Sequence, residues 1–184
     1  ESGSSVAVDE YDFEPGKLTV LVGPSGVGKS SIFRRLLGFD SSSAALKLDR
    51  VSWMPQASKL FDGSVKTNIV GPGRRVNESM LRSACDMAAL DDLTAEHEIG
   101  VSGASVSGGQ AQRICLARAF YRALESKCSH ILLDEPISAL DEARASVVVH
   151  SLKAFAARGV TVVAISHQKS LVDSADRVIE VASA

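Results

Sequence analysis

The feature that most constrains this chain is a glycine-rich segment, GPSGVGKSS, at residues 23–31. The segment fits the pattern GxxxxGK[ST], follows the apolar run Leu18–Val22, and precedes residues with helical periodicity. Glycines in a strand-to-helix turn of this kind let successive backbone N–H groups face inward, and the helix start adds the positive end of its dipole. The segment therefore predicts an α/β fold that binds a nucleoside triphosphate.

All residues of this loop are candidate nucleotide contacts. Lys29 places a positive charge beside the β- and γ-phosphates, and Ser30 offers a hydroxyl group to Mg²⁺. The alternative is a glycine-rich turn with an exposed lysine and no ligand, which the flanking strand and helix patterns disfavour. The predicted contacts are Gly23, Pro24, Ser25, Gly26, Val27, Gly28, Lys29, Ser30 and Ser31.

Composition narrows the class of protein. With 184 residues, 45% of them hydrophobic, the chain suits one globular domain that folds without a disulfide or metal staple. A net charge of −2 argues against a nucleic-acid partner, which requires a basic face. No apolar run approaches the roughly 20 residues that cross a bilayer. Cys85, Cys115 and Cys128 form no CxxC pair, so we expect reduced, mostly buried thiols in a cytoplasmic setting. Residues 1–5, ESGSS, resemble a flexible lead, and they do not have the pattern of a signal or transit peptide.

Short apolar runs alternate with longer helical patterns, as in a parallel sheet with covering helices. Because the runs are apolar throughout, we expect strands that are buried on both faces. Residues 77–90, 110–124 and 145–155 show helical periodicity. Residues 57–128 contain few strand signals and predict a helical insertion in a core made of residues 1–56 and 129–184. The predicted strands are Leu18–Val22, Val51–Met54, Ile131–Leu133, Val160–Ile165 and Val178–Val181.

A second acidic site follows one of these strands, in the sequence HILLDEP at residues 130–136. The carboxyl ends of the strands are where ligands of open α/β folds collect. Asp134 is therefore a candidate Mg²⁺ ligand, and Glu135 a candidate base that polarises the attacking water. The alternative is an ordinary acidic pair that leads into a helix.

The sequence VSGGQAQRICLARAF at residues 106–120 resembles the signature motif of ATP-binding cassette (ABC) ATPases. Ser107, Gly108 and Gly109 leave backbone N–H groups unobstructed at a helix start, which makes a second anion-binding helix end. With Gln110, they are predicted to bind nucleotide. The resemblance implies a head-to-tail dimer, in which the signature of one subunit closes over nucleotide held by the other. Alone, the motif could be a helix cap without a ligand.

Other elements of the family follow in order. Gln56 in WMPQ is similar to the Q-loop glutamine, which reaches toward Mg²⁺ and the attacking water. Asp141 in SALD resembles the D-loop aspartate, which the resemblance makes a further nucleotide contact, and His167 in AISHQ resembles the switch histidine near the γ-phosphate. The resemblance, from about residue 16 to 181, implies a single ABC ATPase domain. Its fold would be a P-loop NTPase (RecA-like) parallel-sheet core with an inserted α-helical signature subdomain. Its reaction would be hydrolysis of MgATP to ADP and phosphate, with Lys29, Gln56, Glu135 and His167 as catalytic residues.

Two further segments are similar to exporter-type cassettes: KLFDGSVKTNI at residues 59–69 and HEIG at residues 97–100, where Glu98 and Gly100 are the matching residues. In exporters these segments dock on a membrane-spanning transporter domain, although either could be an ordinary surface loop. The resemblance implies an ATPase at the cytoplasmic side of a membrane, paired with a second ABC ATPase domain in a homo- or heterodimer. No nucleic-acid partner is expected.

The chain departs from the family pattern in two places. Lys29 and Gln56 are only 27 positions apart, and the loop Ser41–Ala45 marks where an antiparallel β region is shortened. Tyr11 and Phe13 lie too close to the following turn to stack on adenine, so we expect both in the core. A lost base stack costs about 1–3 kcal/mol and predicts weak ATP binding. Two alternatives to a transporter ATPase follow: a soluble ABC ATPase acting on a macromolecular complex, and a regulatory nucleotide-binding module with little turnover.

Overall fold

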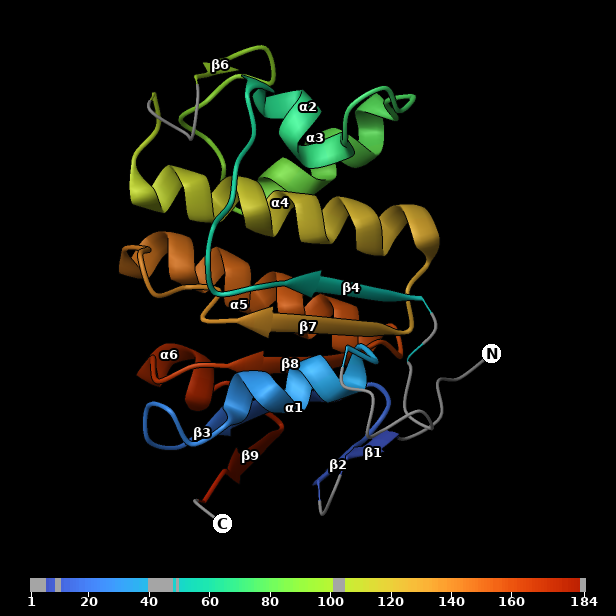
Figure 1. Ribbon diagram of the computed structural model, residues 1–184, viewed down its shortest axis with the longest axis vertical. Helices are drawn as coiled ribbons and strands as arrows, with labels where there is room; N and C mark the ends of the chain where they lie inside the picture. Colours follow the sequence, from blue (N-terminus) through green and yellow to red (C-terminus); the bar gives the residue numbers. More distant parts are fainter. Residues whose placement is uncertain (1–5, 9–10, 40–47, 49, 101–104, 183–184) are drawn as a thin grey trace.

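A five-stranded parallel sheet forms the centre of the computed structural model, which describes residues 6–8, 11–39, 48, 50–100 and 105–182 (Figure 1). The strand order is β4-β7-β8-β3-β9. All four pairings are parallel, so the carboxyl ends of the strands lie at one edge of the sheet. The strands are β3 (Leu18–Val22), β4 (Val51–Met54), β7 (His130–Asp134), β8 (Thr161–Ile165) and β9 (Arg177–Glu180). All five predicted strands are confirmed, with ends shifted by one residue at most.

Burial separates the central strands from the edge strands. β7 and β8 are buried along their whole length, and β3 is buried except at its last residue. In β4 burial alternates, and β9 is mostly exposed. The expectation that all five strands are buried on both faces is therefore wrong for β4 and β9. Among the described residues, each of these strands has a single neighbouring strand, and an edge position leaves apolar residues such as Trp53 and Val178 partly in solvent.

Helices cover both faces of the sheet. α1 (Lys29–Leu36) packs on one face against Leu132 of β7 and Val163 of β8. On the other face, α4 (Gly108–Ser126) and α5 (Glu142–Ala157) pack against the alternate residues Ile131 and Val162. The helix predicted at residues 110–124 is α4, and the one at 145–155 is α5. A short helix, α6 (Lys169–Val172), follows β8.

Residues 57–128 hold α2 (Val65–Val70), α3 (Glu78–Met87) and α4, with α2 and α3 packed on the side of α4 that faces away from the sheet (Figure 1). The helix expected at residues 77–90 is α3. α4 also contacts β4, so this segment shares core with the sheet. The division into a core and a helical insertion stays a prediction.

Two short antiparallel pairs were not expected. β1 (Val6–Val8) pairs with β2 (Tyr11–Phe13), and β5 (Gly63–Ser64) pairs with β6 (Glu98–Ile99). Two- and three-residue strands are too short to show a period of two, so hydrophobic periodicity does not reveal them.

The structure also tests the expectations for the N-terminal aromatic residues, the cysteines and membrane-spanning helices. Phe13 is buried as expected, while the side chain of Tyr11, the lead at residues 1–5 and the loop Ser41–Ala45 lie outside the described residues. The thiols of Cys115 and Cys128 are buried and free, and that of Cys85 is free and half-buried. Within the described residues, no helix has the length and apolarity that a bilayer crossing requires.

Candidate functional site

The glycine-rich loop connects the carboxyl end of β3 to α1, which begins at Lys29. Gly28 precedes the helix with φ 103°, and Gly23 has φ 141°, values that side-chain-bearing residues rarely adopt. A Cβ atom at Gly23 would lie 2.5 Å from the carbonyl oxygen of Val181, just after β9. The loop can therefore take this path only with glycine at position 23.

Lys29 lies under this loop with 8% of its surface exposed. Its Nζ donates to the carbonyl oxygens of Gly23 at 2.6 Å and Pro24 at 2.8 Å. Both acceptors are neutral, so the ammonium group has no counter-charge from them. A phosphate group in the pocket would supply that counter-charge.

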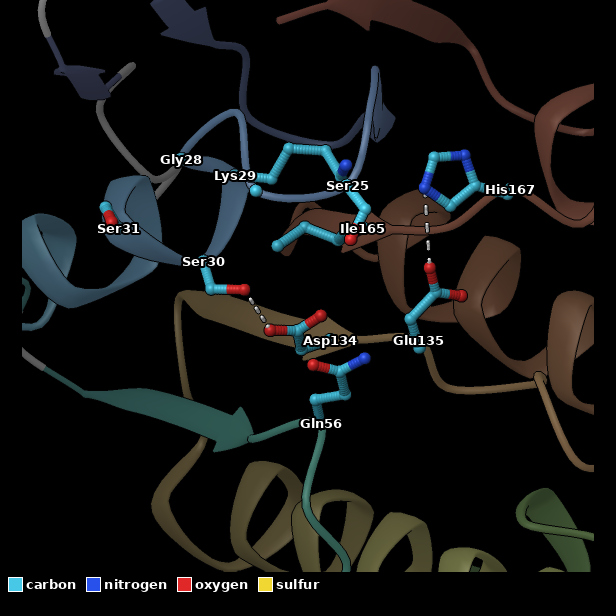
Figure 2. Close-up of a pocket in the computed structure, with 11 residues that line it drawn as sticks. Ser25, Gly28, Lys29, Ser30, Ser31, Gln56, Asp134, Glu135, Ile165 and His167 are labelled. Carbon is cyan, nitrogen blue, oxygen red and sulfur yellow. Dashed lines mark hydrogen bonds and ion pairs between the residues drawn. The ribbon is translucent and has the colours of Figure 1, made fainter.

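Ser30 and Asp134 join the loop to the end of β7. Ser30 Oγ donates to Asp134 Oδ2 at 2.7 Å (Figure 2). Burial raises the pKa of the Asp134 carboxyl, although the Ser30 hydrogen bond and the Lys29 charge oppose that rise. A hydroxyl and a carboxylate are oxygen donors of the kind that Mg²⁺ prefers, and Gln56 lies below Asp134 in the same view. The donor set fits Mg²⁺, which usually takes one or two carboxylates and completes its shell with water and phosphate.

Glu135 has an unusual backbone. Its φ is 52°, in the left-handed region, and its N–H donates to the carbonyl oxygen of Ile165 at 2.9 Å. Its Oε1 lies 3.8 Å from Nε2 of His167, the two side chains facing one another in Figure 2. Burial is the main cause that raises the pKa of Glu135, and the His167 side chain acts in the opposite direction. The carboxylate of Glu135 is therefore held at the edge of the pocket beside the imidazole of His167.

These residues line one pocket of about 350 Å³ at the carboxyl ends of β3, β7 and β8 (Figure 2). Most of the predicted catalytic and phosphate-binding residues are brought together here. Gly23, Pro24 and Val27 belong to the same loop but do not line the pocket. The lining residues are Ser25, Gly26, Gly28, Lys29, Ser30, Ser31, Gln56, Asp134, Glu135, Ile165 and His167.

The signature residues lie elsewhere, at the start of α4, and none of residues 107–110 lines this pocket. Ser107 is the N-cap of α4: its Oγ accepts from the Gln110 N–H at 3.2 Å, and Gln110 Oε1 accepts from the Ser107 N–H at 2.9 Å. Gln110 also donates to Asp92 at 3.2 Å. Its side chain is thus committed to the cap, while Ser107 and Gly108 remain exposed.

Asp141 is also a helix cap in this chain and is not part of the pocket lining. Its carboxylate accepts from the Arg144 N–H at 2.9 Å and forms an ion pair with the Arg144 guanidinium at 2.8 Å. These contacts lower the pKa of Asp141, the backbone hydrogen bond most strongly. Arg144 also contacts Asp91 at 3.0 Å, which links the start of α5 to the loop after α3.

The two exporter-like segments lie side by side. Gly63 pairs with Ile99, and Ser64 pairs with Glu98, in the β5–β6 ladder. The Glu98 side chain is exposed, and residues 101–104, which follow Gly100, lie outside the described part of the chain. Residues more than 30 positions apart in the sequence thus pair with one another, and the two segments form one surface.

Two buried residues of α4 were not predicted as functional, although both fall in the motif at 106–120. Gln112 contacts the backbone of Glu135, and Arg113 forms an ion pair with Asp92 at 2.6 Å. Nothing in the sequence indicates these partners, because Gln112 is 23 positions from Glu135 and Arg113 is 21 positions from Asp92.

The protein-family model described as "ABC transporter" matches residues 8–138. The chain is 34% identical over 200 residues to the mycobactin import ATP-binding/permease protein IrtB of Mycolicibacterium smegmatis, an alignment that covers 96% of this chain and 34% of that protein. It is 33% identical over 191 residues to the ABC multidrug transporter mdr4 of Aspergillus fumigatus, with 91% and 14% covered. It is 32% identical over 186 residues to the ATP-binding cassette sub-family B member 6 of Mus musculus, with 90% and 22% covered.

Among solved structures, the chain is similar to a bacterial Atm1-family ABC exporter with ATP bound, at a TM-score of 0.80 and 25% identity. That match covers 97% of this chain and 36% of the exporter chain. The chain thus spans about a third or less of the length of these relatives, one of which is named for import and another for export. Since the family model covers well over half of the chain and the fold agrees throughout, the chain belongs to the ABC transporter family and forms an ATPase domain of that family.

Proposed function

We propose that this chain binds MgATP in the pocket at the carboxyl ends of β3, β7 and β8 and hydrolyses it to drive an exporter-type transporter. The observation that carries the proposal is the convergence of Lys29, the Ser30–Asp134 pair and the Glu135–His167 pair on one pocket. These groups supply a cation for the phosphates, oxygen ligands for a metal ion and a base for water.

Six of the lining residues divide the tasks of hydrolysis among them. Lys29 exchanges its two carbonyl acceptors for phosphate oxygens, which are the stronger partners because they are charged. Ser30, Asp134 and Gln56 would hold a magnesium ion, which would neutralise charge on the phosphates. Glu135 takes the proton from the water that attacks the γ-phosphorus as the bond to ADP breaks, and His167, whose Nε2 lies 3.8 Å from the Glu135 carboxylate, orients that carboxylate.

A second ATPase domain completes the site. The N-terminus of α4 does not line the pocket of its own chain, yet Ser107 and Gly108 expose a capped helix end that suits phosphate. In a head-to-tail pair, this end of one chain faces the pocket of the other. Gln110 holds the cap at the start of α4, and Asp141 caps the start of α5.

The proposed partner beyond the dimer is a membrane-spanning domain at the cytoplasmic side of a membrane. The similar proteins named above are transporters, and the β5–β6 surface joins the two exporter-like segments. These names favour a transporter over the soluble ABC ATPase. The regulatory alternative, with little turnover, is separated by measuring hydrolysis itself.

The experiment that tests the proposal uses Glu135→Gln, which keeps the shape of the side chain but removes the base. Turnover should fall 10²- to 10⁴-fold, the usual contribution of a general base, while MgATP still binds. Light scattering with saturating MgATP should then show the mass of a dimer. Hydrolysis that survives the substitution contradicts the role of Glu135. A bound but monomeric variant contradicts the two-chain site.

A further inference from the structure

Gln112 is a buried residue of α4 whose side chain serves the segment after β7. It lies in the second turn of the helix with 5% of its surface exposed. Its Nε2 donates to the carbonyl oxygen of Glu135 at 2.7 Å and to Ser138 Oγ at 2.9 Å, and its Oε1 accepts from the Ala139 N–H at 3.0 Å. One side chain therefore holds three groups over five consecutive residues.

The first of these contacts falls on a residue that needs support. Glu135 has φ 52°, and a left-handed conformation is unfavourable for a residue with a side chain, so the surroundings must impose it. The Ile165 carbonyl fixes the N–H of Glu135. The Glu135 carbonyl oxygen accepts from Gln112 Nε2 at 2.7 Å and, at longer distances, from Ser138 Oγ at 3.2 Å and the Ser138 N–H at 3.4 Å. The peptide groups on both sides of the Cα atom are thus held.

A second contact shows that α4 and this segment fit closely. A Cβ atom at Gly109, one turn before Gln112, would lie 3.0 Å from the carbonyl oxygen of Ala139. The helix start therefore approaches the backbone of residue 139 from one side, while Gln112 bonds its N–H. The place of the segment is set by α4 through two independent contacts.

Building on the proposed ATP hydrolysis, we propose that Gln112 is a positioning residue for Glu135. By bonding the Glu135 carbonyl, it keeps the backbone in the left-handed conformation that turns the carboxylate toward the pocket and His167. Without that bond, the longer contacts from Ser138, whose hydroxyl group Gln112 also holds, are left at the Glu135 carbonyl. The φ of Glu135 can then relax to negative values, which swings the carboxylate away from the attacking water. Because Gln112 belongs to the signature helix, it also links the motif offered to the partner with the base of its own pocket.

The direct test compares kcat and KM for MgATP in Gln112→Leu and the wild type, measured on the intact protein. A misplacement of about 1 Å can cost on the order of 10²-fold in rate, so kcat should fall by up to that factor. KM should stay within about threefold, because Gln112 touches neither the glycine-rich loop nor Lys29. The matched control is Ser52→Ala, which removes a buried hydrogen bond of 2.6 Å between β4 and the same helix, at the Ala119 carbonyl. Its kcat should equal that of the wild type.

A second variant removes the dependence on how well Gln112→Leu folds. Gln112→Glu has nearly the same shape, but only its protonated form can donate to the Glu135 carbonyl. Burial raises the pKa of such a carboxyl, so its protonated fraction grows as the pH falls from 8 toward 6. The ratio of variant kcat to wild-type kcat should rise over that range. Circular dichroism at each pH is the control, because ionisation of a buried carboxyl also lowers stability. Where the variant stays folded over this range, a purely structural role predicts a constant ratio.

The outcomes separate this inference from the function on which it rests. If the wild type shows no Glu135-dependent hydrolysis, the proposed function fails and this inference fails with it. If hydrolysis depends on Glu135 but Gln112→Leu keeps its kcat, or the Gln112→Glu ratio does not change with pH, only the role of Gln112 is overturned. An equal loss in Ser52→Ala also overturns it, because general weakening of α4 would then explain the effect.

Discussion

At the scale of single residues, the protonation of Glu135 governs the pH range of the reaction. Burial raises its pKa above the ordinary value of 4.5, and a base must be unprotonated to act. The acid limb of kcat/KM, which reports groups of the free enzyme, should therefore lie at higher pH than for an ordinary glutamate. The measurement is kcat/KM between pH 4.5 and 8 at constant saturating Mg²⁺.

Unfolding is the competing explanation for an acid limb, and linkage gives its sign. The folded pKa values of Asp134 and Glu135 are raised, so the folded chain binds these protons more tightly than the unfolded chain. Above their folded pKa values, the buried carboxylates of Asp134 and Glu135 lower the free energy of unfolding, and protonation removes this destabilisation as the pH falls. These two groups therefore do not promote acid unfolding. Circular dichroism at each pH is the control. A limb centred at or below 4.5 in folded protein contradicts the prediction.

Gly23 gives a second prediction at this scale. Gly23→Ala should destabilise the chain by about 2–4 kcal/mol, since a left-handed residue costs roughly 1–2 kcal/mol and the Cβ atom meets a backbone oxygen at 2.5 Å. Gly159→Ala is the matched control, because Gly159 has φ 88° with no atom within 4 Å of its Cβ position. Gly159→Ala should lose only the roughly 1–2 kcal/mol of stability that the left-handed backbone costs. Urea unfolding measures both, and equal losses would show that the contact with Val181 is not limiting.

At the scale of elements, the start of α4 carries two roles that substitutions can separate. Ser107→Ala removes the cap acceptor and should cost about 1 kcal/mol of unfolding free energy. Ser107→Asp keeps a cap and suits the helix dipole, so stability should be retained. Its negative charge would repel a phosphate, so dimerisation with MgATP should be lost. Urea unfolding measures the stability of both variants, and light scattering measures their dimerisation. If Ser107→Asp dimerises normally, phosphate does not bind at the start of α4.

Elements also show what the sequence can predict. Continuous apolar runs locate β3, β7 and β8 because burial on both faces requires them, and the motif order locates the helices that follow. The exposure of β4 and β9 depends on strand order, which no single run encodes. The site divides in the same way between what the sequence predicts and what it does not. The roles of Lys29 and Asp134 follow from local sequence patterns. The left-handed backbone of Glu135 and its bond to Gln112 arise only when α4 packs beside β7.

At the scale of the whole molecule, the two anion-binding helix ends cannot serve one nucleotide within a single chain as folded here, since residues 107–110 are absent from the pocket lining. This separation predicts complementation between defective chains. Lys29→Ala removes the phosphate cation, and Ser107→Asp blocks the helix end, so each variant alone should be inactive. A mixed pair joins the intact Lys29 pocket of one chain to the intact Ser107 of the other and restores one site of two.

Random pairing in an equal mixture would put half of the dimers in the mixed form and leave about a quarter of the wild-type sites intact. That share rises toward about half where the variants, which lack an intact site in their own homodimers, do not pair with themselves. The measurement is ATP hydrolysis per chain after mixing the two variants, with each variant mixed with itself as the control. Both substitutions in the same chain should give no recovery when that chain is mixed with itself. Activity that appears only in the mixture requires a site built from two chains. Failure to recover, with dimers present, means that Lys29 and Ser107 do not act on the same nucleotide.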